Sequence, residues 1–170
     1  EGETGRQGLV DGTEKFTDAQ YVEVWETLAA WGEYMPEGYE AIGYGDMQNL
    51  FTLGQAAVYP AGSWEIAIFN NLIGDEFAYD AFPPPLPEAG DTCYINDHMD
   101  MGMALNADAK HPEEAKIFLS WLGSAEFAEI WNNALPGFFS LSNHSVDIND
   151  PMAQEFLSWR NDCNQSFRNA

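Results

Sequence analysis

Positive charge is scarce in this sequence. Six lysines and arginines stand against 28 aspartates and glutamates, which gives a formal net charge of −22 over 170 residues. A field of that sign repels phosphate backbones and anionic lipid headgroups within a Debye length of about 8 Å at physiological salt. We therefore expect neither nucleic acid nor a membrane surface as a partner. The acidity has two interpretations, a solvated face suited to a salty medium or a set of cation ligands, and the solvated face is the simpler.

Long hydrophobic runs are absent as well. No stretch of about 18 consecutive apolar residues occurs, so the sequence predicts no membrane-spanning or membrane-inserted segment. No signal-like segment follows Glu1, and the last residues, CNQSFRNA, continue a helical pattern without a Gly or Pro to end it. We expect the sequence to be an internal segment of a longer protein.

The usual catalytic motifs are missing too. The sequence contains no G-x-S-x-G elbow, Walker loop, G-x-G-x-x-G or H-E-x-x-H motif. With 28 carboxylates, no acid and base pair stands out from the rest. The motifs therefore identify no candidate catalytic residue, and we expect no cofactor.

Cysteine is limited to Cys93 and Cys163, which lie far apart and lack the C-x-x-C spacing of zinc and thioredoxin-type sites. In an exported protein these two residues would form a disulfide, and closing so long a loop stabilises by about 4 kcal/mol on the chain-entropy estimate. Two buried free thiols are the alternative. The residues alone leave both open.

Amphipathic helical patterns alternate with short apolar runs, which favours an α/β fold. The segment FTDAQYVEVWETLAAW predicts a helix opened by a capping box of Thr17 and Gln20, with Trp25 and Trp31 on a face that packs inward. Further helices are expected in GDMQNLFTLG, in WEIAIFNNL, after Pro112, from Ser124 and after Asp150. Strands are expected in QAAVYPA (55–61), EFAYDAF (76–82) and MDMGMALNA (99–107).

A proline-rich connection and a polar cluster follow each other in the middle of the chain. Prolines at positions 83, 84, 85 and 87 stiffen the chain and indicate a crossing between two structural units. The cluster NDHMD then contains Asp97, His98 and Asp100. A metal site is disfavoured because Asp97 and His98 point to opposite faces of an extended segment. A hydrogen-bonding site for a neutral polar ligand and a plain polar loop are the other two interpretations.

Aromatic side chains follow two turns. Trp64 lies at the start of a helical run, directly after Gly62 and Ser63. Phe138 and Phe139 follow a Pro-Gly turn, and adjacent side chains of an extended segment point to opposite sides. One phenylalanine can therefore pack while the other faces a cleft, and burial of both is an equally open alternative.

The segments FTDAQYVEVWETLAAW, LFTLGQAAVYPAGSWEI, MGMALNADAKHPEEAKIFLSWLGSAEFAEIW and LPGFFSLS occur in this order. Together they resemble the extracellular solute-binding proteins of ABC-type sugar importers, the maltose-binding-protein-like group. The resemblance implies a periplasmic binding protein-like type II fold with two α/β lobes and hinge crossings. It assigns residues 1–95 to the C-terminal-type lobe, 96–136 to the other (N-terminal) lobe and 137–170 to a return. Family members are longer, so the fold is expected to be incomplete in this chain, which lacks their first half.

The same resemblance implies a function without catalysis. Such a protein captures a sugar or polyol in the cleft between its lobes and delivers it to ABC permease subunits in the membrane. The tryptophan of the family's G-x-W turn commonly stacks on a sugar ring, a role that falls on Trp64. Glu65, Asp97 and His98 are then expected to bind the ligand's hydroxyl groups. The turn at Gly137, Phe138 and Phe139 completes the expected ligand-binding set.

Export to a bacterial periplasm or the cell exterior is also implied, and it favours a Cys93–Cys163 disulfide. Two other functions stay open. A fragment of an exported carbohydrate-active hydrolase would need two carboxyl groups about 5 to 10 Å apart, one on each side of the scissile bond. A purely structural fragment would shield Trp64 from solvent.

Overall fold

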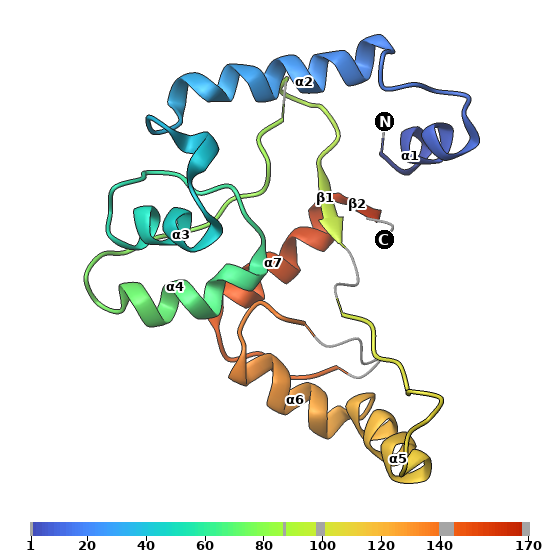
Figure 1. Ribbon diagram of the computed structural model, residues 1–170. Coiled ribbons are helices and arrows are strands. Elements are labelled where there is room, and N and C mark those ends of the chain that lie inside the picture. The colour runs from blue at the N-terminus through green and yellow to red at the C-terminus, as the bar shows by residue number, and fades with distance from the viewer. Residues whose placement is uncertain (1, 87, 98–100, 140–144, 168–170) are drawn as a thin grey trace. The chain divides into compact units, whose positions relative to one another are not determined.

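The structure is a computed structural model that describes residues 2–86, 88–97, 101–139 and 145–167 (Figure 1). The chain divides into two compact units, a first unit of Glu1–Val58 and a second unit of Tyr59–Ala170. Helices dominate both units. Within the described ranges the strands form one two-stranded sheet, which lies in the second unit.

The first unit is entirely helical in its regular structure. It contains α1 (Gly2–Asp11), α2 (Ala19–Trp31), α3 (Tyr44–Thr52) and the short 3-10 helices η1 (Gly32–Tyr34) and η2 (Tyr39–Ala41). The hydroxyl of Tyr21 in α2 donates to the carbonyl oxygen of Gly5 in α1 at 2.9 Å. The helix predicted in GDMQNLFTLG (45–54) is confirmed as α3, which begins after Gly43 without a side-chain cap.

The helix predicted in FTDAQYVEVWETLAAW is confirmed as α2, but its start and its packing differ from the prediction. It begins after Asp18 without a side-chain cap, because the Asp18 carboxylate accepts instead from the backbone N–H of Lys15 at 2.8 Å. None of its residues is buried, and Trp25 and Trp31 are 57% and 44% exposed. The expected inward packing of these tryptophans is therefore wrong. An apolar helix face needs a second layer to cover it, and α2 contacts chiefly η1, which only continues it along the chain.

The second unit is also mainly helical. Its elements are η3 (Ser63–Glu65), α4 (Ile66–Ile73), β1 (Tyr94–Asp97), α5 (Pro112–Leu122), α6 (Ala125–Ala134), α7 (Pro151–Asp162) and β2 (Asn164–Phe167). Its buried apolar side chains come from α4, α6 and α7: Ile66, Phe69, Ile73, Ala128 and Ala153. The α4 residues recur at helical spacing, so one face of this short helix supplies most of the core volume.

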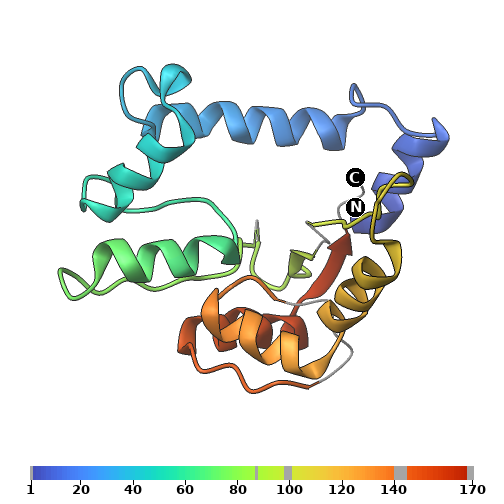
Figure 2. The ribbon, with the colours of Figure 1, turned by 60° about the horizontal axis from the view of Figure 1, so that its bottom comes forward.

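Local signals located the starts of α5, α6 and α7 correctly. The Ser124 hydroxyl accepts from the Phe127 N–H at 3.1 Å, and an Asp150 carboxylate oxygen accepts from the Ala153 N–H at 2.8 Å. Proline stands at the start of α5 and of α7. Such residues satisfy or remove N–H groups that a helix leaves without partners. Gly123 is the C-cap of α5 and Ser124 the N-cap of α6, and these two successive helices run in different directions (Figure 2).

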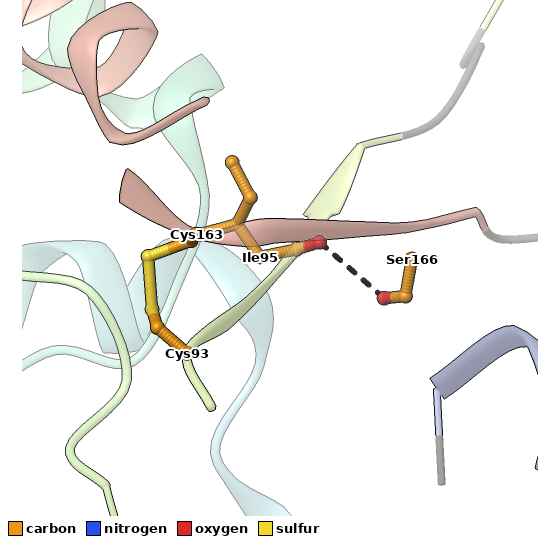
Figure 3. Close-up of a disulfide and its surroundings, with 4 residues drawn as sticks. All are labelled: Cys93, Ile95, Cys163 and Ser166. Carbon is orange, nitrogen blue, oxygen red and sulfur yellow. Dashed lines mark hydrogen bonds between the residues drawn. A yellow bond between two sulfur atoms is a disulfide. The ribbon is translucent and has the colours of Figure 1, made fainter. Parts of the chain in front are cut away.

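The sheet is held by a disulfide. Strands β1 and β2 pair in parallel from Tyr94↔Asn164 to Asp97↔Phe167. Cys93 and Cys163, one residue before each strand, are bonded with their Cα atoms 4.7 Å apart (Figure 3). The Asn164 N–H donates to the Cys93 carbonyl at 2.9 Å. Of the two alternatives for the cysteines, the structure has the disulfide. The expected continuation of a helix through 164–167 is wrong, because the disulfide and strand pairing hold this segment extended.

Three predicted strands do not form. Residues 55–61, 76–82 and the described part of 99–107 are in neither helix nor strand, except for turn positions. A strand needs an edge to receive its backbone hydrogen bonds, and the described residues supply only the pairing of β1 with β2. The α/β expectation therefore holds only as a mixed structure with much helix and little strand. The assignment of 1–95, 96–136 and 137–170 to lobes stays a prediction.

A polar network joins α4 to α7. The Tyr79 hydroxyl donates to Asn70 Oδ1 at 2.6 Å, and Asn70 Nδ2 donates to Asp150 Oδ2 at 2.7 Å. Asp150 is also the cap of α7. Burial, and secondarily the negative charge of Asp150, raise the pKa of Tyr79 from 10.0 to about 12. The folded state therefore favours the neutral phenol.

Removing the disulfide is expected to lower the free energy of unfolding by up to about 4 kcal/mol, because the unfolded chain regains loop entropy. Urea unfolding followed by circular dichroism tests this with oxidised protein, reduced protein and the Cys93→Ser, Cys163→Ser double variant. Reduced protein and the double variant should share one lower midpoint, and reductant should not affect the double variant. Equal midpoints for all three forms would contradict the prediction.

The raised pKa of Tyr79 predicts that the free energy of unfolding falls at high pH. Its raised pKa means that the stabilisation by the neutral phenol is complete below pH 10.0 and is lost as the pH rises through about 12. Tyr79→Phe should cost about 1 kcal/mol at neutral pH, since the hydrogen bond to Asn70 is lost. The difference in unfolding free energy between the two proteins should shrink across that window. A constant difference in a pH series of urea titrations would argue against the assignment.

Candidate functional site

Trp64 is the middle residue of η3, which leads directly into α4, and its side chain is partly exposed. Its side chain is 36% exposed, whereas the next two residues, Glu65 and Ile66, are each 2% exposed. The Glu65 N–H donates to the Gly62 carbonyl at 3.2 Å and closes the turn. This exposure argues against the alternative in which Trp64 is shielded inside a structural core.

The indole ring of Trp64 packs against Gly62. A Cβ atom on Gly62 would lie 2.2 Å from Cζ3 and 2.5 Å from Cη2 of Trp64, so the six-membered part of the indole occupies the space beside this glycine. The backbone of Gly62, with φ −130° and ψ −179°, is extended and open to any residue. The need for glycine here is therefore a matter of space beside the ring.

Ser63 joins the Trp64 turn to the turn after α6. The Ser63 hydroxyl donates to the Gly137 carbonyl at 2.6 Å, across 74 residues of sequence. A Cβ on Gly137 would lie 1.7 Å from the carbonyl oxygen of Ser63, and Gly137 has φ +91°. Both the left-handed backbone and the close approach require glycine. The structure thus brings together the two turns that the sequence predicted for the site.

The Gly137 turn is connected to α6 by a hydrogen bond and a ring contact. The Phe138 N–H donates to the Leu135 carbonyl at 3.0 Å, and the Phe138 ring meets the ring of Trp131 edge to face at 6.5 Å. Phe139 is half-buried. The contact of Phe138 with Trp131 shows that one phenylalanine packs, and a cleft-facing role for Phe139 stays a prediction. Neighbouring ring contacts continue the aromatic row through Trp131, Phe127, Trp121 and Phe118.

The polar residues expected in the site lie in other environments. Glu65 is buried in the turn itself. Asp97 ends β1 and forms a salt bridge with Arg160 of α7. His98 lies outside the described residues. Contact of Glu65, Asp97 and His98 with a ligand therefore stays a prediction.

Among the described residues, no group of three or more His, Cys, Asp or Glu side chains is placed to hold a metal ion. One cavity of about 400 Å³ in the first unit is lined by residues such as Ile42, Asp46 and Leu50, and one of about 570 Å³ in the second by residues 146–149, Gln154 and Leu157. The Trp64 turn lines neither of them. Nor, in this part of the chain, does any helix combine the length and apolarity needed to cross a bilayer.

The hydrogen bond from Ser63 to Gly137 was not predicted. Trp64 and Gly137 were expected in the site separately, but the Ser63 hydroxyl that connects the two turns carries no local signal, because its partner is 74 residues away. A Ser between Gly and Trp is equally compatible with a helix cap. Only the fold shows which carbonyl this hydroxyl reaches.

Comparison with protein families gives one match. A family model described as bacterial extracellular solute-binding protein matches residues 2–129. Comparisons with curated proteins and with solved structures found no match.

Gly137→Ala should destabilise the second unit by about 2 to 4 kcal/mol, because the new Cβ collides with the backbone of Ser63 and strains a left-handed residue. Gly90→Ala is the matched control, since Gly90 has φ +99° with nothing within 4 Å of its Cβ position. That control should cost only the backbone strain, about 1 kcal/mol. Urea unfolding compares both variants with wild type. Equal losses for the two would show that the close approach is unimportant.

Proposed function

Because the chain belongs to the bacterial extracellular solute-binding protein family, we propose that it captures a sugar or polyol and delivers it to the permease of an ABC importer. Family membership implies an exported protein that binds a solute and works with a transporter. The finer parts of the proposal concern the chemistry of the solute and the residues that bind it.

The observation that carries the proposal is the partly exposed indole of Trp64, packed against Gly62 in a turn that is tied to Gly137. A flat aromatic face complements the apolar C–H face of a sugar ring. Polar groups around such a ring then determine which hydroxyl arrangement is accepted. An indole with a fixed position is suited to this task, because less side-chain freedom is lost when the ligand binds.

The charge of the protein disfavours an anionic ligand. A net charge of −22 disfavours phosphorylated or carboxylated solutes through long-range repulsion. Sugars and polyols carry no charge and are recognised by hydrogen bonds and stacking instead. An uncharged hydroxylated solute therefore fits both the aromatic face and the electrostatic field.

Binding is proposed to work by closure of two lobes, with residues 1–95 and 137–170 belonging to one lobe and 96–136 to the other. The closed form makes more contacts with the ligand, so the ligand shifts the population of conformations toward closure. The permease would then recognise the closed form. No covalent chemistry is part of this mechanism.

The hydrolase alternative finds less support in the acidic residues named for the site. Hydrolysis needs two carboxyl groups that both reach the bond to be cleaved. Glu65 is buried to 2% exposure, and Asp97 is engaged by Arg160. These two carboxylates fit supporting roles better than an acid and nucleophile pair.

A thermal-shift screen with glucose, galactose, maltose, maltotriose and sorbitol tests the proposal first, since a ligand of the folded state raises the Tm. Calorimetry with the sugar that gives the largest shift then compares wild type with Trp64→Ala. Loss of the stacking face should weaken binding by about 2 kcal/mol, or roughly 30-fold. Folding should change little, because the ring is partly exposed.

Trp25→Ala is the control, since Trp25 is 57% exposed and lies in α2. It should leave the affinity unchanged. A Trp64→Ala protein that binds the sugar as tightly as wild type would refute the stacking role. A screen in which no sugar or polyol raises the Tm would refute the proposed class of ligand.

A further inference from the structure

We propose that Gly62 and Ser63 are positioning residues that set the orientation of the Trp64 indole. The inference rests on the proposed function, because it assigns how the stacking face is held. Neither residue needs to touch the ligand. Their effect on binding would pass entirely through the ring of Trp64.

The side chain of Trp64 occupies the space beside Gly62. The positions of its ring atoms leave no room for a Cβ on Gly62, which would lie 2.2 Å from Cζ3 and 2.7 Å from Cε3. The colliding group is a side chain, so an alanine at this position is accommodated by rotation of the indole. Because the backbone at Gly62 is extended, the turn itself tolerates alanine. Gly62→Ala should therefore move the ring and leave the fold intact.

The backbone that carries the Trp64 ring is held by its neighbours on both sides. Ser63 approaches Gly137 closely in two ways: its hydroxyl donates to the Gly137 carbonyl at 2.6 Å, and its carbonyl oxygen lies 1.7 Å from the position that a Gly137 Cβ would take. On the other side of Trp64, Glu65 and Ile66 are each only 2% exposed. The Trp64 backbone is thus fixed from both sides. The side-chain torsions of Trp64 then place the indole in the space beside Gly62.

The consequence for binding is pre-organisation. A ring that is already ordered spares the ligand the entropy of ordering it. A variant that moves the indole from this position should weaken sugar binding about three- to tenfold. This loss is smaller than the one expected when the ring itself is removed. A purely structural role for Gly62 would lower stability without this separate loss of affinity.

The test uses the full chain labelled with 5-fluorotryptophan, in which Trp64→Phe identifies the ¹⁹F resonance of Trp64. Gly62→Ala and Ser63→Ala should both shift this resonance. Ser63→Thr keeps the hydroxyl and should restore the wild-type position. Gly102→Ala is the matched control, because nothing lies within 4 Å of a Cβ at Gly102. Thermal unfolding checks that each variant folds.

Calorimetry with the panel sugar that gave the largest Tm shift completes the test. Gly62→Ala and Ser63→Ala are expected to bind it three- to tenfold more weakly, and Ser63→Thr and Gly102→Ala like wild type. An unshifted Trp64 resonance in Gly62→Ala, or a shifted one with unchanged affinity, overturns the proposal. If no panel sugar binds wild type, the proposed function fails, and the resonance of Gly62→Ala still decides whether this glycine sets the ring orientation.

Discussion

The close approach of Ser63 to Gly137 is the contact on which the candidate site depends. It joins two turns separated by 74 residues, and it leaves room only for glycine at the second of them. Without it, the turn that carries Trp64 and the turn that follows α6 would be independent. With it, the indole is held in a defined relation to the helix that precedes Gly137. Family membership implies solute binding, and in the proposed function this contact holds the aromatic face of Trp64 in position for the ligand.

Two further long-range links act in the same unit. The disulfide joins Cys93 to Cys163, and the network from Tyr79 through Asn70 reaches Asp150. All three links connect residues between Ser63 and Cys93 with residues between Gly137 and Cys163. Among the described residues of this unit, the buried apolar side chains are few and include those of two alanines. Covalent and polar links therefore carry a larger share of its stability than they do around a large hydrophobic core.

What the sequence could predict was local. Ser124, Asp150 and the prolines at helix starts act within one turn, and the structure has helices where they indicated them. The strands expected at 55–61, 76–82 and 99–107 failed because a strand depends on a partner that no local pattern specifies. The tryptophan face of α2 failed for a related reason, since burial needs another layer. The Trp64 turn was predicted from the resemblance. The hydrogen bond between Ser63 and Gly137 could not be predicted, because it depends on how the fold brings two distant turns together.

The central claim is that the Ser63–Gly137 contact acts on ligand binding through Trp64. A double-mutant cycle on sugar affinity, with Ser63→Ala, Trp64→Ala and the combination, measures this coupling directly. If the account is correct, Ser63→Ala weakens binding in the wild-type background and has no further effect once Trp64 is alanine. Additive losses would contradict it, because they would show that Ser63 contributes to binding independently of the indole.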